Sequence, residues 1–442
     1  MAMDRVADAA RLRSTLAANP QDRVSWHNLA AVEGDLGHAE EAAKAARRAI
    51  ALGIPAPETH VVLARALQDL NRLDEAERSF EEALALRPVY PAAHRDLAQL
   101  RWMRSGRIDD ALRALDDTLR RAPHEKYLHL VRSIALEFMG ELPAALASAE
   151  AGLVHAPAEL ELLQQASHLC AESGAGERAV DFARLALKLA PGVPAVQVTL
   201  CEALLASGRA LDAEGVAAAL CAKEPDDQHA IALRATAWRL LGDERYAALF
   251  DYARLTHAES IDISLEETAA ALTALHRYAS HPFQQSVRGG GQLPLNEKEL
   301  AVPAIRTLFE KFEGAIDRHL ARLDRGVDPF RSRNTGRHAI TGAWSVRLSS
   351  GGYHVDHVHQ RGWLSSAFYV AVPPVMKPEA ARAGWLRFGR PGVTTRPELA
   401  ADHHVRPEPG KLVLFPSYMW HGVEPFASDV PRLTVAFDAL PD

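Results

Sequence analysis

Cysteine is scarce in this sequence, which has three cysteines among 442 residues, all in the first half of the chain (Cys170, Cys201 and Cys221). Their number is odd, and their spacing matches no cysteine-based metal site, so the pattern argues against a disulfide framework. We therefore expect three buried thiols in a reducing compartment, with the cytoplasm as the default location.

Long apolar runs and an excess of basic residues are also absent. No run of about 18 apolar residues occurs, so the sequence predicts no membrane-spanning helix. Residues 1–5 lead into a polar helical pattern without the apolar segment of a signal peptide. The formal net charge is -7, whereas non-specific nucleic-acid binding requires a basic surface. We expect neither a membrane nor a nucleic acid as a partner.

The first half of the chain repeats itself with a period of 34 residues. A glycine or asparagine is expected to take the left-handed turn after the first helix of each unit, an alanine to let paired helices approach closely, and a proline to end the second helix. The members of the three series are Gly37, Asn71, Gly106, Gly140, Gly174, Gly208 and Gly242; Ala42, Ala76, Ala111, Ala145, Ala179 and Ala213; and Pro88, Pro123, Pro157, Pro191 and Pro225.

This pattern resembles the tetratricopeptide repeat, a helix–turn–helix unit of 34 residues. Trp26, Leu29, Gly37 and Ala42 mark the first copy, and residues 71–88 closely match the second half of a unit. We count six units and a partial seventh between about residues 20 and 255. Such units stack into a solenoid with a concave groove, so the resemblance implies a peptide or protein partner. A structural spacer or a dimerisation arm stays open as the alternative.

The repeat period stops at about Ala258. Residues 265–278 and 299–322 have helical patterns. Between them Gly289 to Gly291 predict a loop, because consecutive glycines are unfavourable inside helices and strands. The segment 281–294 is then either a linker or the rim of an active site. In the second case Gln285, Arg288 and Gln292 would line its mouth, where Arg288 could bind an anionic group.

From about Ile340 the apolar period becomes two, which predicts β-strands. The expected strands cover residues 343–348, 363–372, 384–389, 411–416 and 431–439. Many short strands without intervening helices imply a sandwich or barrel, and about a hundred residues suffice for a jelly roll.

Four histidines and an aspartate stand out in this β-rich half. His354, Asp356, His357 and His359 lie within six residues, and His421 follows on another apolar run. Imidazole and carboxylate ligands that leave coordination positions open suit Fe(II). Two ligands separated by one residue on a strand point to the same side, so this cluster could supply two ligands and His421 a third.

The segment resembles the double-stranded β-helix of the Fe(II)/2-oxoglutarate-dependent oxygenases, in particular those that follow tetratricopeptide repeats and, more distantly, the prolyl hydroxylases. The matching stretches are SGGYHVDHVH (350–359), WLSSAFYV (363–370), GKLVLFPSYMWHGVEPF (410–426) and PRLTVAFD (431–438). The resemblance covers about residues 282–442. It implies Fe(II) and 2-oxoglutarate as cofactors, and hydroxylation of an unactivated C–H bond with release of succinate.

Two assignments of the metal ligands stay open. The common pattern of two histidines and one carboxylate selects His354, Asp356 and His421. Aligning Gly351-Gly352 with the Gly-Gly that precedes the ligands in prolyl hydroxylases selects His357, His359 and His421 instead, with Asp356 orienting an imidazole. We favour the second set, although an all-histidine site departs from the usual oxygenase pattern and is more positive by one unit of charge.

The resemblance also assigns the cosubstrate site. The family has an arginine about ten residues after the distal histidine and a serine or threonine two residues further on. Arg432 lies eleven residues after His421, and Thr434 follows two residues later. The resemblance implies that both bind 2-oxoglutarate, with the guanidinium on its distal carboxylate. Arg347 and Arg387 also lie on expected strands and could contact the cosubstrate or the substrate.

The sequence thus predicts a multidomain protein, α and then β. An all-α tetratricopeptide solenoid (1–257) precedes a linker with supporting helices (258–338) and a double-stranded β-helix, or jelly-roll, oxygenase core (339–442). The expected function is Fe(II)/2-oxoglutarate-dependent hydroxylation of a peptide or protein side chain recruited by the repeats. Two rivals are a cupin-type metalloenzyme that uses no 2-oxoglutarate and a non-catalytic tetratricopeptide scaffold. The sequence identifies neither the substrate, nor the hydroxylated atom, nor the oligomeric state.

Overall fold

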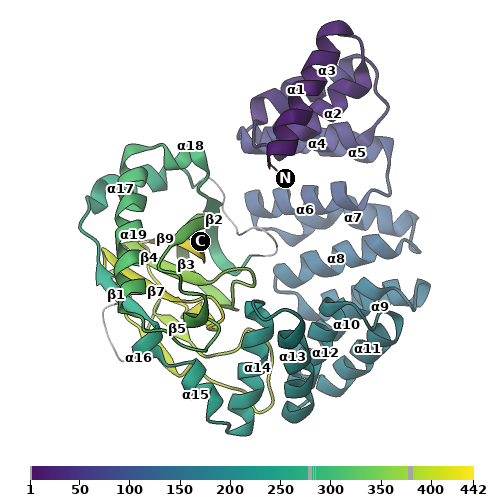
Figure 1. The fold of residues 1–442 in the computed structure, drawn as a ribbon. Helices are drawn as coiled ribbons and strands as arrows, with labels where there is room; N and C mark the ends of the chain where they lie inside the picture. Colours follow the sequence, from purple (N-terminus) through teal and green to yellow (C-terminus); the bar gives the residue numbers. More distant parts are fainter. Residues whose placement is uncertain (1, 277–280, 282, 284, 377–381) are drawn as a thin grey trace. The chain divides into compact units, whose positions relative to one another are not determined.

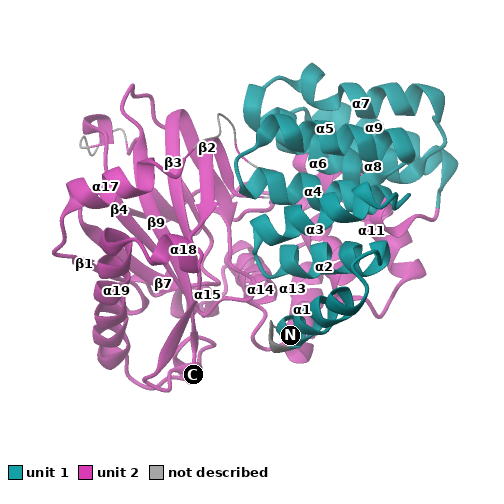
Figure 2. Ribbon diagram, turned by 90° about the horizontal axis from the view of Figure 1, so that it is seen from above, with its two compact units in different colours: residues 1–157 teal, residues 158–442 magenta. Residues whose placement is uncertain are grey.

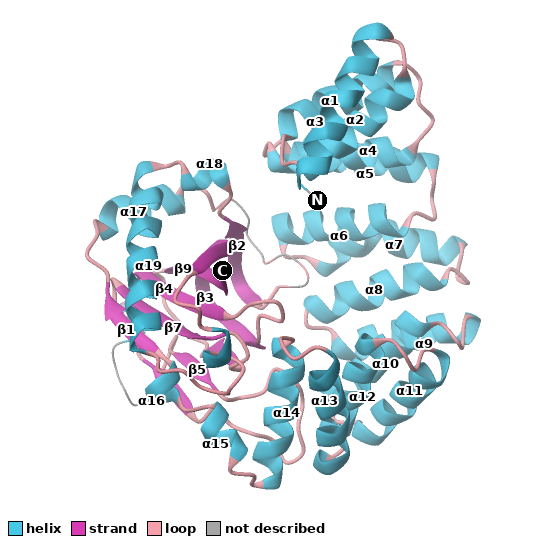
Figure 3. Ribbon diagram, in the orientation of Figure 1, coloured by secondary structure: helices cyan, strands magenta, loops and turns pink. Residues whose placement is uncertain are grey.

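The computed structural model describes residues 2–276, 281, 283, 285–376 and 382–442, which form two compact units, Met1–Pro157 and Ala158–Asp442 (Figure 2). Helices fill the first unit, and the second contains further helices and all of the described strands (Figure 3). In these described ranges, no helix is long and apolar enough to cross a membrane. The units divide inside the repeat array, so the predicted domain boundaries at 257/258 and 338/339 stay predictions.

The repeat array consists of six helix pairs, α2–α3 to α12–α13, followed by a single helix, α14 (Figure 1). The helices of the first unit are α1 (Ala2–Ala18), α2 (Arg23–Asp35), α3 (Ala39–Ala51), α4 (Pro57–Asp69), α5 (Leu73–Leu86), α6 (Pro91–Ser105), α7 (Ile108–Arg121), α8 (Lys126–Phe138) and α9 (Leu142–His155). Those of the second unit begin with α10 (Leu160–Glu172), α11 (Gly176–Leu189), α12 (Pro194–Ala206), α13 (Ala210–Lys223) and α14 (Gln228–Leu241).

The three residue series occupy the positions that the period predicts. The turn residues Gly37, Asn71 and Gly106 have positive φ angles of 77°, 58° and 64°, and the later members of the series do likewise. All six alanines are at most 1% exposed, so a larger side chain would separate the paired helices. The predicted helical array is therefore confirmed. Two of the three thiols, Cys170 and Cys201, are buried as expected, whereas Cys221 is half-buried.

The strands of the second unit form a curled, antiparallel sheet. They are β1 (His257–Ser260), β2 (Val287–Pro294), β3 (His338–His357), β4 (Leu364–Ala371), β5 (Leu386–Phe388), β6 (His403–Val405), β7 (Lys411–Pro416), β8 (His421–Val423) and β9 (Arg432–Pro441). Their order is β1-β7-β4-β9-β3-β8-β5-β6, with β2 paired to β3. This arrangement confirms the predicted jelly roll. The five expected strands are present, whereas β1, β2, β6 and β8 were not expected.

The prediction of a loop at Gly289–Gly291 is wrong, because these glycines belong to β2. A Cβ atom on Gly290 would lie 2.3 Å from the backbone oxygen of Arg347 in the neighbouring strand β3. Gly289 has a φ of +66° at an irregularity in the pairing of the two strands. The glycines therefore permit a close approach and a bulge between strands, a use that glycine has in sheets as well as in loops.

Four short helices and one long helix accompany the sheet, and the long helix packs on it. They are α15 (Arg245–Leu249), α16 (Tyr252–Leu255), α17 (Leu265–Thr273), α18 (Glu297–Leu300) and α19 (Pro303–Arg322). The expected helix 265–278 ends at Thr273, and Tyr278 lies outside the described residues. The expected helix 299–322 is divided before Pro303. Phe312 of α19 packs on Phe368 and Phe437 of the sheet, with ring centroids 5.2 and 4.9 Å apart.

His319 of α19 predicts a pH dependence of stability. The side chain is fully buried, and neither ring nitrogen has a hydrogen-bond partner among the residues with described positions. Burial lowers its pKa to about 3, with His257 and Arg322 acting in the same direction. Unfolding below about pH 6.5 therefore takes up a proton, so stability is lost as the pH falls from 6.5 towards 3. Phenylalanine does not titrate, so His319→Phe should lose none of this stability. We expect its free energy of unfolding, relative to that of wild type, to be about 1 kcal/mol higher at pH 5.5 than at pH 8. Chemical denaturation at both pH values measures this, and an equal effect at both would contradict it.

Candidate metal centre

Three imidazoles from two chain segments converge at one end of the sheet. His357 ends β3, His359 lies in the turn that follows, and His421 begins β8. His357 and His421 are cross-strand partners, with ring centroids 4.3 Å apart. The ring of His359 lies 5.2 Å from His357 and 5.1 Å from His421. One ligand nitrogen from each of the three lies within 4.8 Å of the others, close enough to share one metal ion.

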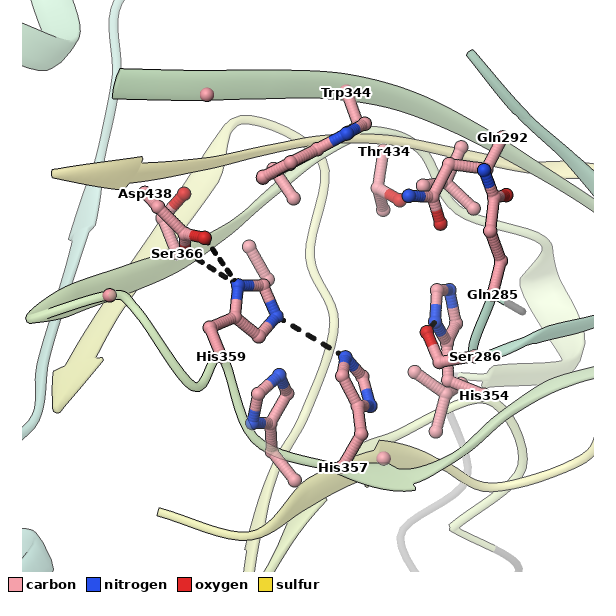
Figure 4. A pocket seen from close by; sticks show the side chains of 18 of the residues that line it. Gln285, Ser286, Gln292, Trp344, His354, His357, His359, Ser366, Thr434 and Asp438 are labelled. Atoms are coloured by element: carbon pink, nitrogen blue, oxygen red, sulfur yellow. Dashed lines mark hydrogen bonds and ion pairs between the residues drawn. The ribbon is translucent and has the colours of Figure 1, made fainter. Parts of the chain in front are cut away.

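The hydrogen bonds of these imidazoles select one tautomer. Nδ1 of His357 lies 2.9 Å from the backbone oxygen of Val355, and Nδ1 of His421 lies 2.9 Å from that of Met419. A carbonyl oxygen can only accept, so in both rings Nδ1 carries the proton. Nδ1 of His359 donates to the carboxylate of Asp438, at 2.7 and 2.6 Å from its two oxygens (Figure 4). This leaves Nε2 of His357 and of His421 as the nitrogen that can bind a metal, and Nε2 of His359 lies 3.2 Å from that of His357 (Figure 4).

Burial keeps two of these rings neutral. It lowers the pKa of His357 to about 3 and the pKa of His421 well below its usual value, and the neighbouring imidazoles act in the same direction. A metal binds only the unprotonated nitrogen, so the neutral form is the one that a metal site requires. His357 and His421 thus offer the right ligand atoms in the right protonation state.

Asp438 is a functional candidate that sequence reasoning missed. Besides accepting from His359, its carboxylate accepts a hydrogen bond of 2.8 Å from Ser365 Oγ. Arg432, Thr434, Ala436 and Asp438 alternate along β9, and all four line the same cavity. The signal was present in the sequence, because a period of two that turns Arg432 inward also turns Asp438 inward.

The members of the alternative ligand pair have other partners. Asp356 accepts two hydrogen bonds of 2.8 Å from Arg387, and both side chains are 6% exposed. The expectation that Asp356 orients an imidazole is therefore wrong. Arg387, which could have contacted the cosubstrate or the substrate, binds Asp356 and Glu424 instead. His354 lies beside the triad, with Nδ1 3.0 Å from Ser286 Oγ. His354 and His357 both reach the cavity despite their odd spacing, because the pairing of β3 with β8 shifts register between them.

A cavity of about 460 Å³ opens beside the three imidazoles (Figure 4). Two glutamine side chains, Gln285 and Gln292, line it on the side away from Asp438 in this view, as the sequence suggested for an active-site mouth. Arg288 and Arg347 do not line it. Arg288 donates through Nη1 to the backbone oxygens of Gln285 and Val287. Arg347 follows a lining residue on β3 and so points to the other face of the strand.

Arg432 is a buried cation in the same cavity. It is 2% exposed, and its guanidinium carbon lies 5.1 Å from the ring centroid of Tyr369. Among the residues that the structure describes, no carboxylate pairs with it, and neither its Nε nor the Tyr369 hydroxyl has a hydrogen-bond partner. Burial lowers the pKa of Arg432, which is the mark of a cation without a counter-charge. Thr434 lies two residues further along the same face of β9. The guanidinium of Arg432 and the hydroxyl of Thr434 therefore offer hydrogen-bond donors to a small anion in this corner of the cavity.

The fold and the site together define a repeat protein with a jelly roll that contains a candidate metal centre. Residues 342–438 match the family model described as "Putative 2OG-Fe(II) oxygenase", and residues 71–134 match that of the tetratricopeptide repeat. Both resemblances expected from the sequence are confirmed. The chain thus carries tetratricopeptide repeats followed by a domain of that oxygenase family.

Solved structures similar to the chain are repeat proteins. A thermophilic tetratricopeptide protein of Thermus thermophilus is 26% identical over 42% of this chain and 99% of its own, with a TM-score of 0.31. A tetratricopeptide protein of Parabacteroides merdae is 14% identical over 52% of this chain and 90% of its own, with a TM-score of 0.39. Pseudomonas aeruginosa pilF is 14% identical over 47% of this chain and 95% of its own, with a TM-score of 0.35. No curated protein matches the chain.

Proposed function

We propose that this protein is an Fe(II)- and 2-oxoglutarate-dependent dioxygenase that hydroxylates a C–H bond, on a peptide or protein side chain recruited by its repeats. One observation carries the proposal. Three imidazoles with occupied Nδ1 atoms direct Nε2 atoms toward one another, beside a buried arginine without an acidic partner.

His357, His359 and His421 would hold the iron through Nε2. When bound, Fe(II) and 2-oxoglutarate supply the oxidising chemistry, in which O2 is consumed, 2-oxoglutarate becomes succinate and CO2, and one oxygen atom enters the substrate. Asp438 holds the ring of His359 in position and increases the basicity of its Nε2. The carbonyls of Val355 and Met419 do the same for His357 and His421.

Arg432 and Thr434 would bind the distal carboxylate of 2-oxoglutarate. The guanidinium presents two donors in one plane, which matches the geometry of a carboxylate. Pairing with that carboxylate would also give the buried cation the counter-charge that it lacks in the protein alone. This lack favours the proposal over a cupin-type enzyme that binds no anion beside its metal.

The other wall of the cavity would receive the substrate. Gln285 and Gln292 offer amide donors and acceptors there, and the buried Oε1 atom of Gln285 has no hydrogen-bond partner in the described part of the chain. Amide groups of this kind orient a polar side chain or a peptide backbone. Tetratricopeptide repeats generally bind peptide or protein segments, which is the reason for proposing a substrate of that class.

The proposal predicts iron-dependent formation of succinate. The full-length protein incubated with Fe(II), 2-oxoglutarate and ascorbate is expected to release succinate slowly without substrate, and faster with its partner. Mass spectrometry of the partner should then show peptides that are heavier by one oxygen atom. A protein that binds metal but not 2-oxoglutarate in an anaerobic titration would support the cupin-type rival. A protein that binds neither would support the non-catalytic scaffold.

A further inference from the structure

The last helix of the repeat array, α14, contacts both chain segments that carry the proposed ligands. In the second compact unit α14 lies beside the sheet (Figures 1 and 3). Its N-terminus is bonded to the residue that follows His359, and its middle is bonded to the residue that precedes His421. Neither contact is expected of a helix that only extends a peptide-binding groove.

At the N-terminus of α14, one carboxylate serves two purposes. Asp227 Oδ1 caps the helix by accepting from the backbone NH groups of His229 and Ala230, at 2.9 and 3.1 Å. Asp227 Oδ2 accepts from the side-chain amide of Gln360, at 2.9 Å. The backbone NH of Gln228 also donates to the backbone oxygen of Gln360, at 3.1 Å. The turn after His359 and the start of α14 are therefore one hydrogen-bonded unit.

In the middle of α14, a buried hydroxyl fixes an indole. Trp420 Nε1 donates to Thr236 Oγ1 at 2.9 Å, and the backbone oxygen of Ala232 lies 3.3 Å away. Thr236 and Trp420 are 1% and 3% exposed, so the indole NH has no water to replace this partner. His229 of the same helix packs edge-on against the Trp420 ring, with centroids 5.7 Å apart. Trp420 directly precedes His421, so its orientation constrains the backbone that carries that imidazole.

We propose that α14 is a positioning element of the metal centre. Asp227 positions the turn that carries His359, and Thr236 positions Trp420 and thereby His421. This inference rests on the metal site proposed above. The terminal repeat would then have a second role besides recruitment, because a displacement of α14 would change the geometry of the ligands. His359 is also held by Asp438 and by the backbone oxygen of Ser417, so losing one contact with α14 should weaken the site and not abolish it.

The first test is Asp227→Ser in the full-length chain. Serine is an equally good helix cap through its single hydroxyl, but it has no second oxygen to accept from the Gln360 amide. We expect the affinity for Co(II), followed by visible absorption without any cosubstrate, to fall about tenfold, as for other hydrogen-bond partners behind metal ligands.

The matched control is Asp22→Ser. Asp22 caps α2 in the other compact unit through the same two kinds of backbone bond, both 3.1 Å, so this substitution should leave Co(II) binding unchanged. Circular dichroism melting of each metal-free variant checks that the fold persists.

The second test is Thr236→Val, which keeps the shape of the side chain but removes the hydroxyl. We expect weaker Co(II) binding and a shifted visible spectrum, because the His421 ring is less well held. Thr118→Val in α7 is its control, because Thr118 is also buried and bonds to a backbone oxygen of its own helix. If wild type binds Co(II) and both α14 variants bind it equally well with the same spectrum, the inference is overturned while the proposed function stands. If wild type binds no metal, the proposed function itself fails.

Discussion

His421→Ala is expected to abolish metal binding, whereas His354→Ala retains it. Removing His421 leaves two imidazoles where three converge. Loss of a residue that only hydrogen-bonds to a metal ligand lowers metal affinity by up to about a hundredfold, so loss of the ligand itself should lower it by more. His354 is the matched control because it lies in the same cluster, with its ring 6.1 Å from that of His357 and a hydrogen bond to Ser286. Titration of the metal-free proteins with Co(II) or Fe(II) measures both affinities, and succinate formation should be lost in parallel with binding.

The same titration decides between the two ligand sets that the sequence left open. His357→Ala and His359→Ala should behave like His421→Ala. The opposite pattern, in which His354→Ala loses the metal and His359→Ala keeps it, would restore the pair of His354 and Asp356. The bidentate contact of Asp356 with Arg387 argues against that outcome, because a carboxylate in a buried ion pair would have to leave its partner to reach a metal.

The helical half was predictable because its determinants are local. A glycine in the left-handed turn, an alanine between paired helices and a proline after the second helix each act within a few residues of the chain. Their repetition at a period of 34 therefore fixed the helix pairs and their number. The strand at residues 411–416 was predicted to the residue for a similar reason, since a lysine and the apolar run 412–416 lie between Gly410 and Ser417.

The errors in the β-rich half have a common cause. There, residues distant in sequence decide which structure a residue adopts and which side chain it contacts. Gly290 is a strand residue because Arg347 of another strand approaches it closely. Asp356 faces Arg387 instead of an imidazole because of where β5 lies. The bulge between His354 and His357 depends on the register with β8, which the spacing of the histidines does not reveal. The residue types at the site could thus be predicted, but not all of their partners.

Arg432→Met is expected to make the metal-free protein more stable while abolishing 2-oxoglutarate binding. A buried guanidinium without a counter-charge destabilises the fold, and only the contact with Tyr369 offsets part of this cost. A methionine of similar length removes the charge and should raise the free energy of unfolding by about 1–2 kcal/mol. Arg432 thus lowers stability but serves to bind a ligand. The substitution Arg432→Met should therefore raise the stability of the protein and remove its function.

The ligand should reverse this order of stability. With Co(II) bound under anaerobic conditions, 2-oxoglutarate at about a hundred times its Kd stabilises wild type by about 2.7 kcal/mol, whereas the variant should not respond. Arg347→Met is the control: Arg347 lies on the neighbouring strand, opposite Leu433, and does not line the cavity, so its response to 2-oxoglutarate should equal that of wild type. Melting curves with and without 2-oxoglutarate measure all three proteins. If Arg432→Met melts lower than wild type and still responds to 2-oxoglutarate, Arg432 is a structural residue. The cosubstrate would then bind elsewhere. A wild-type protein that does not respond to 2-oxoglutarate would instead support the cupin-type rival.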